Sequence, residues 1–514
     1  MILSKVEIDA KPVHDLPKEQ YSQFIEHMGS CIKGGIWVEG RTGEDLVMGG
    51  VPRKVMEAVR SLNPPLIRYP GGCFADGYHW KDGIGPRQNR PMKPNLAWKK
   101  MGKKVGPKED NHFGTDEFME FCELVGSKAM ITVNVGSGTA QEAADWVEYC
   151  NGPADSKWGA ERAKNGHPEQ YNVEYWFIGN EITGPHEVGH QKPEQYARTI
   201  KEYVRAMKEI DPDIKLIGSG SWAPKFQFIT QNRKVNEVVL KETGEELDYL
   251  SIHQYVPTME LKNVLRFQIL GKKKSADRST YYSVLDSVDD MEDYVKACVE
   301  DVKKYSPKDK LVQLAFDEWN LWFEFFGDMK GTNYNLRDGL WAATMLNMFH
   351  RYAPYMPITN VAQLVNLLGI INSGERGTFL TPTALVYQLY TAHAGAKYLQ
   401  STVDCPKTPH GKALPLLDVS ATRDDDRAAI FLVNRHYDTA MEVNLNLDGF
   451  AATGEIAAWE IYDDNPVRYN TFEAPEQIAV RDFKGDLSLL KKDDASVSLT
   501  VKPHSAVCVE VHGK

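Results

Sequence analysis

The feature that most constrains the fold of this chain is an alternation of short apolar segments with amphipathic segments between Tyr21 and His393. In one such unit the apolar run "VEYWFIGNE" precedes "PEQYARTIKEYVRAMKEI", whose Pro193 suits the first turn of a helix. About eight strand–helix units can be counted, which is the number that a (β/α)8 TIM barrel needs. A doubly wound α/β sheet is the alternative, but no GxGxxG turn follows the first strand.

After Gly395 the pattern changes to short alternating strands separated by Asp, Gly and Pro turns, as in "AMEVNLNLDGF" and "ASVSLTVKP". This alternation is typical of an antiparallel β-sandwich. The opening segment "LSKVEIDA" has the same pattern, so we expect it to join the sandwich as an extra strand. The predicted organisation is a strand at 1–14 that joins the sandwich, a catalytic barrel at 15–394 and a C-terminal β-sandwich domain at 395–514.

Composition excludes several classes of function. The formal net charge of -11 argues against a nucleic-acid partner, because phosphate binding needs a basic face. No window approaches the eighteen or so apolar residues of a membrane span, and the N-terminus does not resemble a signal peptide. The 7 cysteines are scattered and never spaced as CxxC, which suits reduced thiols. We therefore expect a cytoplasmic protein without a nucleic-acid or membrane partner.

Polar residues stand at the ends of seven of the predicted strands. In a barrel of this kind the catalytic residues lie at the C-terminal ends of the strands. The residues at these ends are Glu26, His27, Arg68, Asn134, Asn180, Glu181, His253, Tyr255, Asp317, Glu318 and Gln363. Fold stability explains such a set poorly, and together the residues predict a polar pocket.

Two carboxylates in this set predict hydrolysis of a glycosidic bond. Glu181 ends the fourth strand and Glu318 ends the seventh. Since side chains alternate along a strand, we expect Glu318 to point into the barrel mouth and Asp317 to pair behind the sheet. One carboxyl group would protonate the leaving oxygen, and the other would attack the anomeric carbon or activate a water molecule. Arg68 would keep Glu318 ionised, and the charge of Glu318 would raise the pKa of Glu181.

Five blocks in this order resemble the signatures of glycoside hydrolase family 51, the α-L-arabinofuranosidases. The blocks are "LIRYPGGCFADGYHWKDGIGPRQNRP", "FIGNE", "SIHQY", "FDEWN" and "NVAQLVN", and the resemblance extends to the tail "VKPHSAVCVEV". It implies a barrel with a β-sandwich, retention of anomeric configuration and exo-acting release of terminal α-L-arabinofuranosyl residues from arabinan or arabinoxylan oligosaccharides. Retention requires the two carboxyl groups to lie roughly 5 to 5.5 Å apart.

The resemblance also assigns roles residue by residue. It implies Glu181 as acid/base and Glu318 as nucleophile. The substrate-binding residues that it implies are Glu26 and Asn180 on sugar hydroxyls, Arg68 beside the nucleophile, Cys73 directly after "PGG", His253 and Tyr255 as positioning residues, and Gln363 on the furanose. It further implies that arabinofuranose-containing oligosaccharides or polysaccharides are the substrates, that no metal or cofactor is needed, and that the protein forms a homo-oligomer.

Aromatic residues near the predicted pocket could stack on sugars, and Trp80, Trp98, Trp319 and Trp322 are the best placed. Of these we expect Trp319 to bind substrate. A carbohydrate-binding protein without catalysis is an alternative, but the presence of both Glu181 and Glu318 favours an enzyme. Activity on β-linked xylan or glucan, as a xylosidase or an endoglucanase, is a further alternative within the same family.

The motif "HEVGH", His186 to His190, matches the HExxH signature of zinc metalloproteases. Such proteases need both histidines on one face of a continuous helix. Pro185 precedes the motif and Gly189 lies inside it, so the segment is predicted to be a loop and the metalloprotease is not favoured. The loop "GPHEVGHQKP" is unfamiliar among the relatives, and it borders the side from which the leaving group departs.

Overall fold

Eight parallel strands close into a barrel in the computed structural model, which describes residues 1–43, 45–98, 108–223, 233–258, 260–323, 333–408 and 414–513. The barrel strands are β2 (Ser22–Phe24), β5 (Leu66–Tyr69), β8 (Lys128–Val133), β9 (Tyr175–Ile178), β10 (Lys215–Ala223), β11 (Tyr249–Val256), β12 (Gln313–Leu321) and β13 (Ile358–Ala362). Each strand pairs in parallel with the next one in this order, and β13 pairs with β2 to close the ring. The predicted barrel is confirmed.

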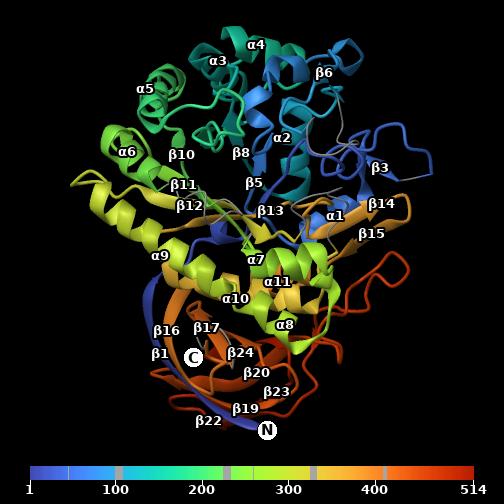
Figure 1. The fold of residues 1–514 in the computed structure, drawn as a ribbon, viewed down its shortest axis with the longest axis vertical. Helices are drawn as coiled ribbons and strands as arrows, with labels where there is room; N and C mark the ends of the chain where they lie inside the picture. Colours follow the sequence, from blue (N-terminus) through green and yellow to red (C-terminus); the bar gives the residue numbers. More distant parts are fainter. Residues whose placement is uncertain are drawn as a thin grey trace.

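Helices follow the strands and cover the outside of the barrel (Figure 1). They are α1 (Arg53–Ser61), α2 (Thr115–Val125), α3 (Ala140–Asn151), α4 (Lys157–Lys164), α5 (Pro193–Ile210), α6 (Lys234–Thr243), α7 (Leu261–Asn263), α8 (Arg278–Leu285), α9 (Val288–Tyr305), α10 (Leu336–Tyr352) and α11 (Pro382–His393). Helix α5 begins at Pro193, as the sequence predicts, and buries Tyr196, Ile200 and Tyr203 at helical spacing.

Excursions between the strands carry short pairs of strands. These are β3 (Leu46–Val47) with β4 (Val51–Pro52), β6 (Lys93–Pro94) with β7 (Lys108–Glu109), and β14 (Ile371–Gly374) with β15 (Gly377–Leu380). The first two pairs lie in the loops that leave β2 and β5. These long loops build up one end of the barrel, where the polar strand ends also lie.

A ten-stranded sheet forms the second part of the molecule. Its order is β21-β20-β24-β18-β17-β16-β1-β19-β23-β22. The bounds are β1 (Ile2–Asp15), β16 (Lys397–Asp404), β17 (Leu417–Arg423), β18 (Arg427–Asn434), β19 (Met441–Asp448), β20 (Ala452–Ile461), β21 (Arg481–Asp482), β22 (Leu487–Lys491), β23 (Ser496–Val501) and β24 (Ser505–Gly513). Strand β1 lies between β16 and β19, which confirms that the N-terminal strand joins the C-terminal domain.

The sheet is antiparallel except for the pairing of β1 with β19, and its core follows the alternation in the sequence. In β19, Met441, Val443, Leu445 and Leu447 are buried at every second position. Figure 1 shows the sheet below the barrel, with α10 and α11 between the two. Among the described residues, no helix combines the length and the apolar character needed to cross a membrane.

Candidate active site

Arg68 is the centre of a polar cluster inside the barrel mouth. Its side chain is fully buried at the end of β5, between the rings of Phe24 and Phe177. Nη1 donates to Oε1 of Glu318 over 2.8 Å, and Nη2 donates to Oδ1 of Asn180 over 2.7 Å. A guanidinium is charged at any pH that proteins tolerate, so it brings a permanent positive charge between the ends of β9 and β12.

Asp317 also faces Arg68, which corrects the prediction that it pairs behind the sheet. Its Oδ2 lies 3.0 Å from Nη1 of Arg68 and 3.3 Å from Nε2 of His253. The reason is an irregularity in β12, where Ser251 pairs with Ala315 but His253 pairs with Glu318. Two residues of β12 therefore oppose one residue of β11, as in a β-bulge, and the strict alternation of sides is lost at Asp317 and Glu318.

Glu318 is held at both of its carboxylate oxygens. Besides the contact of Oε1 with Arg68, Oε2 accepts a hydrogen bond from the Tyr255 hydroxyl over 2.9 Å. Burial raises the pKa of Glu318, and the charges of His253 and Arg68 oppose that rise. The carboxylate is thus fixed in orientation beside two cationic groups.

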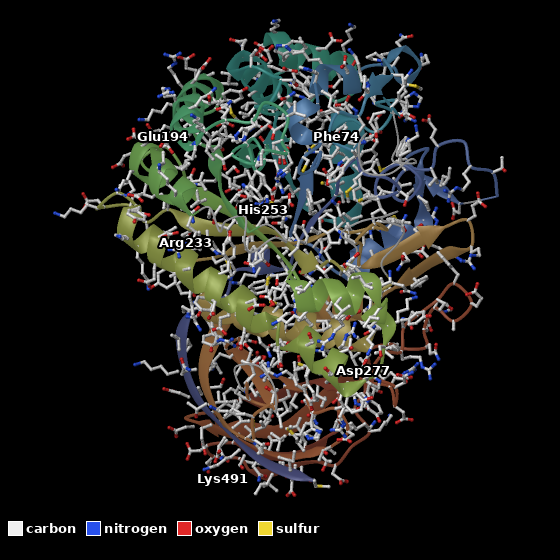
Figure 2. The ribbon with its side chains drawn as sticks, viewed as in Figure 1. Phe74, Glu194, Arg233, His253, Asp277 and Lys491 are labelled. Atoms are coloured by element: carbon white, nitrogen blue, oxygen red, sulfur yellow. The ribbon has the colours of Figure 1, made fainter. Side chains whose placement is uncertain are left out.

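Glu181 follows β9 and lies between two histidines. Its Oε1 is 2.7 Å from Nδ1 of His253, and its Oε2 is 2.8 Å from Nε2 of His186. The Glu181 backbone has a φ of 41°, a left-handed conformation that costs a non-glycine residue roughly 1–3 kcal/mol. One carboxylate oxygen each of Glu181 and Glu318 and a ring nitrogen of His253 lie within 4.8 Å of one another. Figure 2 places His253 in the middle of the barrel.

The pKa of Glu181 is shifted in the direction opposite to the predicted one. Burial alone would raise it, but hydrogen bonds from His186 and His253 hold the pKa of Glu181 below its usual value. Burial lowers the pKa of each histidine, but the surrounding carboxylates raise it to about 10 for His186 and to about 10 for His253. The pKa shifts therefore favour an ionised Glu181 between two protonated imidazoles, instead of the neutral carboxyl group that the sequence predicted.

Glu26 and Gln363 form the opposite wall of the site. Oε1 of Glu26 accepts from the Phe74 backbone and from Nε1 of Trp98, each over 3.1 Å, and Oε2 accepts from Nε2 of Gln363 over 2.9 Å. Burial, together with the charge of Glu318, raises the pKa of Glu26 to about 8. Trp98 thus reaches the site through its indole nitrogen.

Asp76 fixes the loops around the site and does not face it. Its buried carboxylate accepts from the backbone nitrogens of Val135 over 2.9 Å, Gly136 over 3.2 Å and Asn180 over 3.0 Å. It ties the loops after β5, β8 and β9 together. This is a structural role in loop geometry, and it orients the backbone that carries Asn180.

Trp319 lies outside the site, which corrects its predicted role in substrate binding. It is fully buried and packs against Phe349 and Trp341 of α10, with ring centroids 4.9 and 5.8 Å away. Beyond the bulge the side chains alternate again, so Trp319 points away from the barrel mouth where Glu318 points into it. Trp80 is likewise buried, stacked on Trp146, while Trp322 packs edge-on against Tyr255 beside the site.

The HEVGH segment is a series of turns between β9 and α5, as predicted, and not a helix. His186 Nε2 points to Glu181, whereas Nδ1 of His190 lies 2.9 Å from the carbonyl oxygen of Gly184. Glu187 is buried and accepts from Nδ2 of Asn180 over 3.2 Å. The two histidines therefore do not share one metal position of the protease type.

Sequence reasoning missed that His186, Glu187 and Asp317 belong to the site. A usable signal for the first two was their position on the loop after the fourth strand, which opens onto the catalytic end of a barrel. The remaining predicted residues, Cys73, Asn134, Tyr255 and His27 among them, lie on the same loops and strand ends. Asn134 and His27 support the loops, since Nδ2 of Asn134 donates to the Tyr78 carbonyl and the His27 ring packs on Phe74.

Comparison with known families agrees with this arrangement. The α-L-arabinofuranosidase 1 domain matches residues 58–268, and the α-L-arabinofuranosidase C-terminal domain matches residues 317–505. An intracellular exo-α-L-arabinofuranosidase of Bacteroides ovatus is 35% identical over 91% of this chain and 88% of its own length. α-L-Arabinofuranosidase C of Emericella nidulans is 34% identical over 91% of this chain and 90% of its own.

Solved structures give the same result. The chain resembles an α-L-arabinofuranosidase from Thermotoga maritima in complex with arabinose, with a TM-score of 0.85, 31% identity and coverage of 99% of this chain and 100% of the other. It also resembles AbfB, a family 51 α-L-arabinofuranosidase from Bifidobacterium longum, with a TM-score of 0.87, 26% identity and full coverage of both chains (100% each). The likeness extends over both the barrel and the sheet.

Proposed function

This chain belongs to glycoside hydrolase family 51, the α-L-arabinofuranosidases, and from that premise we propose that it releases terminal α-L-arabinofuranosyl residues from arabinan or arabinoxylan oligosaccharides by double displacement. The observation that supports this most directly is the pairing of Glu181 with Glu318, whose nearest oxygens lie within 4.8 Å. Retaining glycosidases hold their carboxyl groups roughly 5 to 5.5 Å apart, whereas inverting ones leave room for a water molecule.

Glu318 is the proposed nucleophile. Arg68 and Tyr255 bind its two oxygens, so that one oxygen stays aimed at the anomeric carbon of a bound furanose. The guanidinium stabilises the ionised form that attacks, and the Tyr255 hydroxyl can remain on Oε2 as charge leaves the carboxylate. The glycosyl–enzyme bond would form at Glu318 as the leaving oxygen takes a proton on the other side.

Glu181 is the proposed acid/base, supplied with its proton by the two histidines. His186 and His253 are both positively charged at neutral pH, with both ring nitrogens protonated, because their pKa values are raised to about 10. The incoming glycosidic oxygen would compete with His186 for Oε2 of Glu181, and this is the more exposed of the two histidine contacts. A proton moving from His186 to Glu181 gives the acid that the first step needs, and the leaving oxygen carries that proton away. The Glu181 carboxylate is then the base for the second step, and the proton that it takes from the attacking water restores the charge of His186.

Glu26, Asn180, Gln363 and Cys73 are the proposed furanose-binding residues, with His253 and Tyr255 positioning the two carboxylates. They come from the loops or strand ends of four different barrel strands. This set suits a single small sugar at the end of a chain, because it supplies several hydrogen-bonding groups around one enclosed point. This arrangement is the basis for proposing that the enzyme removes sugars from the ends of its substrate chains. Nothing in the geometry favours activity on β-linked xylan or glucan.

The cytoplasm is the proposed location. All 7 cysteines are free, and the Bacteroides ovatus relative is described as intracellular. A homo-oligomer is the proposed assembly, with arabinofuranose-containing oligosaccharides or polysaccharides as the binding partners.

Substitution of the two carboxylates tests the mechanism on an aryl α-L-arabinofuranoside. Glu181→Ala should lower kcat on substrates with poor leaving groups by about 10²–10⁴-fold, the range for one acid/base residue. Added azide should restore turnover, since it can attack the glycosyl–enzyme without a base. Glu318→Ala should lose activity at least as severely, and azide should not restore the retaining pathway.

Glu194→Ala is the matched control, because Glu194 is exposed on α5 (Figure 2). This substitution should leave kcat unchanged. The assignment of Glu181 is wrong if Glu181→Ala keeps full activity on a poor leaving group. The assignment of Glu318 is wrong if its alanine variant still turns over with retention.

A further inference from the structure

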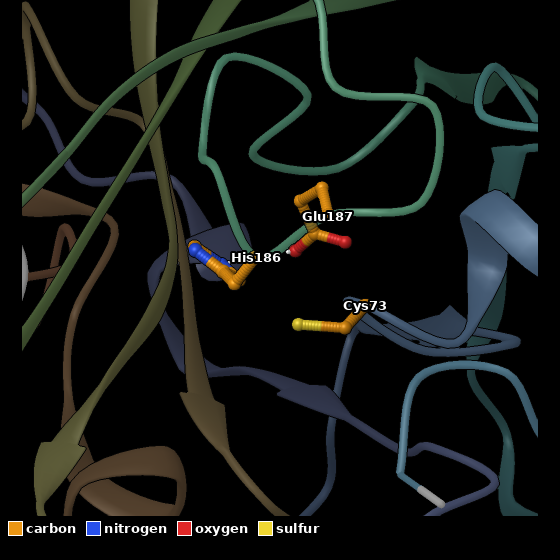
Figure 3. Close-up of side chains that lie close together, drawn as sticks. All are labelled: Cys73, His186 and Glu187. Atoms are coloured by element: carbon orange, nitrogen blue, oxygen red, sulfur yellow. Dashed lines mark ion pairs between the residues drawn. The ribbon is translucent and has the colours of Figure 1, made fainter. Parts of the chain in front are cut away.

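Three side chains of different chemistry converge beside the carboxylate pair. Cys73 follows β5, and His186 and Glu187 lie on the loop between β9 and α5. One ligand atom of each, a thiol sulfur, a ring nitrogen and a carboxylate oxygen, lies within 4.8 Å of the other two. Figure 3 shows the Cys73 sulfur and the Glu187 carboxylate pointing to the same space, with the His186 ring at its side. We call these three residues the Cys-His-Glu cluster.

An unsatisfied carboxylate oxygen points to a missing ligand at this cluster. The Glu187 side chain is only 1% exposed, and its Oε1 is shared between Asn180 and His186 at 3.2 Å each. Its Oε2 is buried and, apart from the weakly donating Cys73 thiol beside the carboxylate, has no hydrogen-bond partner among the described residues. A buried carboxylate oxygen without a partner is costly, and a bound cation is one of the few groups that satisfies it.

We propose that the Cys-His-Glu cluster binds a borderline-soft divalent cation, Zn²⁺ above all, and that the bound ion inhibits the enzyme. Thiolate, imidazole and carboxylate are the three ligand types that zinc takes, and a three-residue set leaves its fourth position to water. Metal–ligand bonds of about 2.0–2.3 Å separate tetrahedral ligand atoms by roughly 3.5 Å. Because the ligand atoms of the cluster lie within 4.8 Å of one another, the longest separation needs to shorten by at most about 1.3 Å.

Inhibition follows from the position of His186. The nitrogen that faces the cluster is Nε2, and the same Nε2 lies 2.8 Å from Oε2 of Glu181. It cannot bind a cation and donate a proton to Glu181 at the same time. Zinc binding would release the thiol proton of Cys73 and the Nε2 proton of His186 to solvent, without any change of oxidation state. Glu181 would lose the partner that supplies its proton.

Access to the cluster is through His186. Its side chain is 42% exposed, whereas Glu187 lies at the bottom of the cluster at 1%. A cation would therefore enter from the side of the leaving group, which is also the side that a substrate must reach. Zinc and substrate should exclude one another, and this part of the inference rests on the proposed function.

Part of the HEVGH motif is thus a metal site, although not the one that its pattern suggests. His186 and Glu187 contribute ligands, Cys73 replaces the second histidine, and His190 is bound to the Gly184 carbonyl away from the cluster. A protease-type site would need both histidines and would not need the cysteine. His190→Gln and Cys73→Ser therefore distinguish a metal bound by the Cys-His-Glu cluster from a metal bound in a protease-type site.

Cobalt titration of the full chain, first treated with a chelator, tests the site without using activity. We expect one Co²⁺ per chain with a thiolate-to-cobalt absorption band in the near ultraviolet, displaced by Zn²⁺. Cys73→Ser should abolish the band, and Glu187→Gln should weaken binding at least 10-fold. His190→Gln and Cys405→Ser, the latter a partly buried cysteine in the sheet domain, should retain both band and affinity.

The proposal is overturned if the unsubstituted chain gives no band, or if Cys73→Ser keeps it. The inhibitory role is tested with Zn²⁺ on an aryl α-L-arabinofuranoside. The apparent KM should rise with Zn²⁺ and return to its original value with a chelator, and an unchanged KM would overturn that role. Cobalt binding in a chain that does not cleave the arabinofuranoside would refute the proposed function and leave the metal site standing.

Discussion

Two adjacent glycines make room for the acidic side chains of the site. A Cβ on Gly71 would lie 2.3 Å from Cγ of Glu26, and a Cβ on Gly72 would lie 2.5 Å from Oε1 of Glu318. Gly71 also has a φ of 154°, a backbone conformation that residues with a side chain rarely adopt, whereas Gly72 is constrained only by the space that Glu318 occupies. The "PGG" turn is thus required by the carboxylates that it touches.

Gly72→Ala should impair catalysis much more than folding. The atom that the new methyl group meets is the end of a flexible side chain, so the fold can absorb it by moving Glu318. A displacement of about 1 Å at a reacting group can cost about 10²-fold in rate. We expect kcat/KM on an aryl α-L-arabinofuranoside to fall by that order, with a change in Tm of no more than a few degrees.

Gly374→Ala is the control for Gly72→Ala, because its Cβ would meet only Phe472 at an ordinary 3.7 Å. It should change neither activity nor Tm appreciably. Equal activities for Gly72→Ala and Gly374→Ala would show that Glu318 is not constrained by the glycine.

At the scale of elements, the bulge in β12 determines which residues meet Arg68. The extra residue between Ala315 and Glu318 brings Asp317 and Glu318 to the same guanidinium. Burial opposes ionisation of Asp317, but the charges of Arg68 and His253 keep its pKa below the usual value. The result is a buried group of alternating charges on which the orientation of the nucleophile depends.

Asp317→Asn should therefore affect both stability and activity. Removing one charge from a buried ion pair costs about 3–5 kcal/mol of unfolding free energy, with the lower end expected here because Glu318 still pairs with Arg68. His253 would also lose a carboxylate that raises its pKa. The basic limb of the kcat profile, measured on the folded enzyme, should consequently move to lower pH.

Asp301→Asn separates the two effects. Asp301 forms an ion pair with Arg233 over 2.7 Å, outside the barrel mouth, so its loss should lower the unfolding free energy and leave the pH profile in place. Identical pH profiles for the Asp317 variant and the unsubstituted enzyme would contradict the role assigned to Asp317.

Sequence periodicity predicted the elements and most of the site, and the bulge explains where it failed. Glu181, Glu318 and Arg68 were found because they end apolar strands, a local signal. Asp317 was misplaced because the register of β12 against β11 is set by tertiary pairing, which alternation cannot report. Trp319 was misplaced although alternation from Glu318 already puts it on the opposite side of the strand. The direction of the Glu181 pKa shift was wrong because His186 comes from an irregular loop.

At the scale of the whole molecule, the barrel rests on the sheet through α10 and α11 (Figure 1). His350 of α10 lies fully buried at this junction. Its Nδ1 is 2.7 Å from the Ser420 hydroxyl of β17, and its Nε2 is 2.8 Å from the Tyr21 hydroxyl. No carboxylate is among these partners, so the imidazole sits in a polar but neutral contact between the two domains.

The junction should make the protein sensitive to acid. Burial lowers the pKa of His350 to about 3, from a usual 6.5. Above pH 6.5 neither the folded nor the unfolded chain binds this proton, and below it the unfolded chain binds a proton that the folded chain excludes. Stability should therefore fall with falling pH by up to about 1.4 kcal/mol per pH unit, or about 2 kcal/mol by pH 5.

His350→Gln should reduce this dependence, because glutamine can keep a hydrogen bond across the junction and does not titrate. In urea unfolding between pH 7.5 and 5, we expect the unfolding free energy of the variant to change by about 2 kcal/mol less than that of the unsubstituted chain. His512→Gln, at a partly exposed position of β24, should keep the original slope. Parallel pH curves for His350→Gln and the unsubstituted chain would mean that acid destabilises the protein elsewhere. A weaker pH dependence of the unfolding free energy in His350→Gln, but not in His512→Gln, would show that one neutral imidazole couples the stability of barrel and sheet to pH.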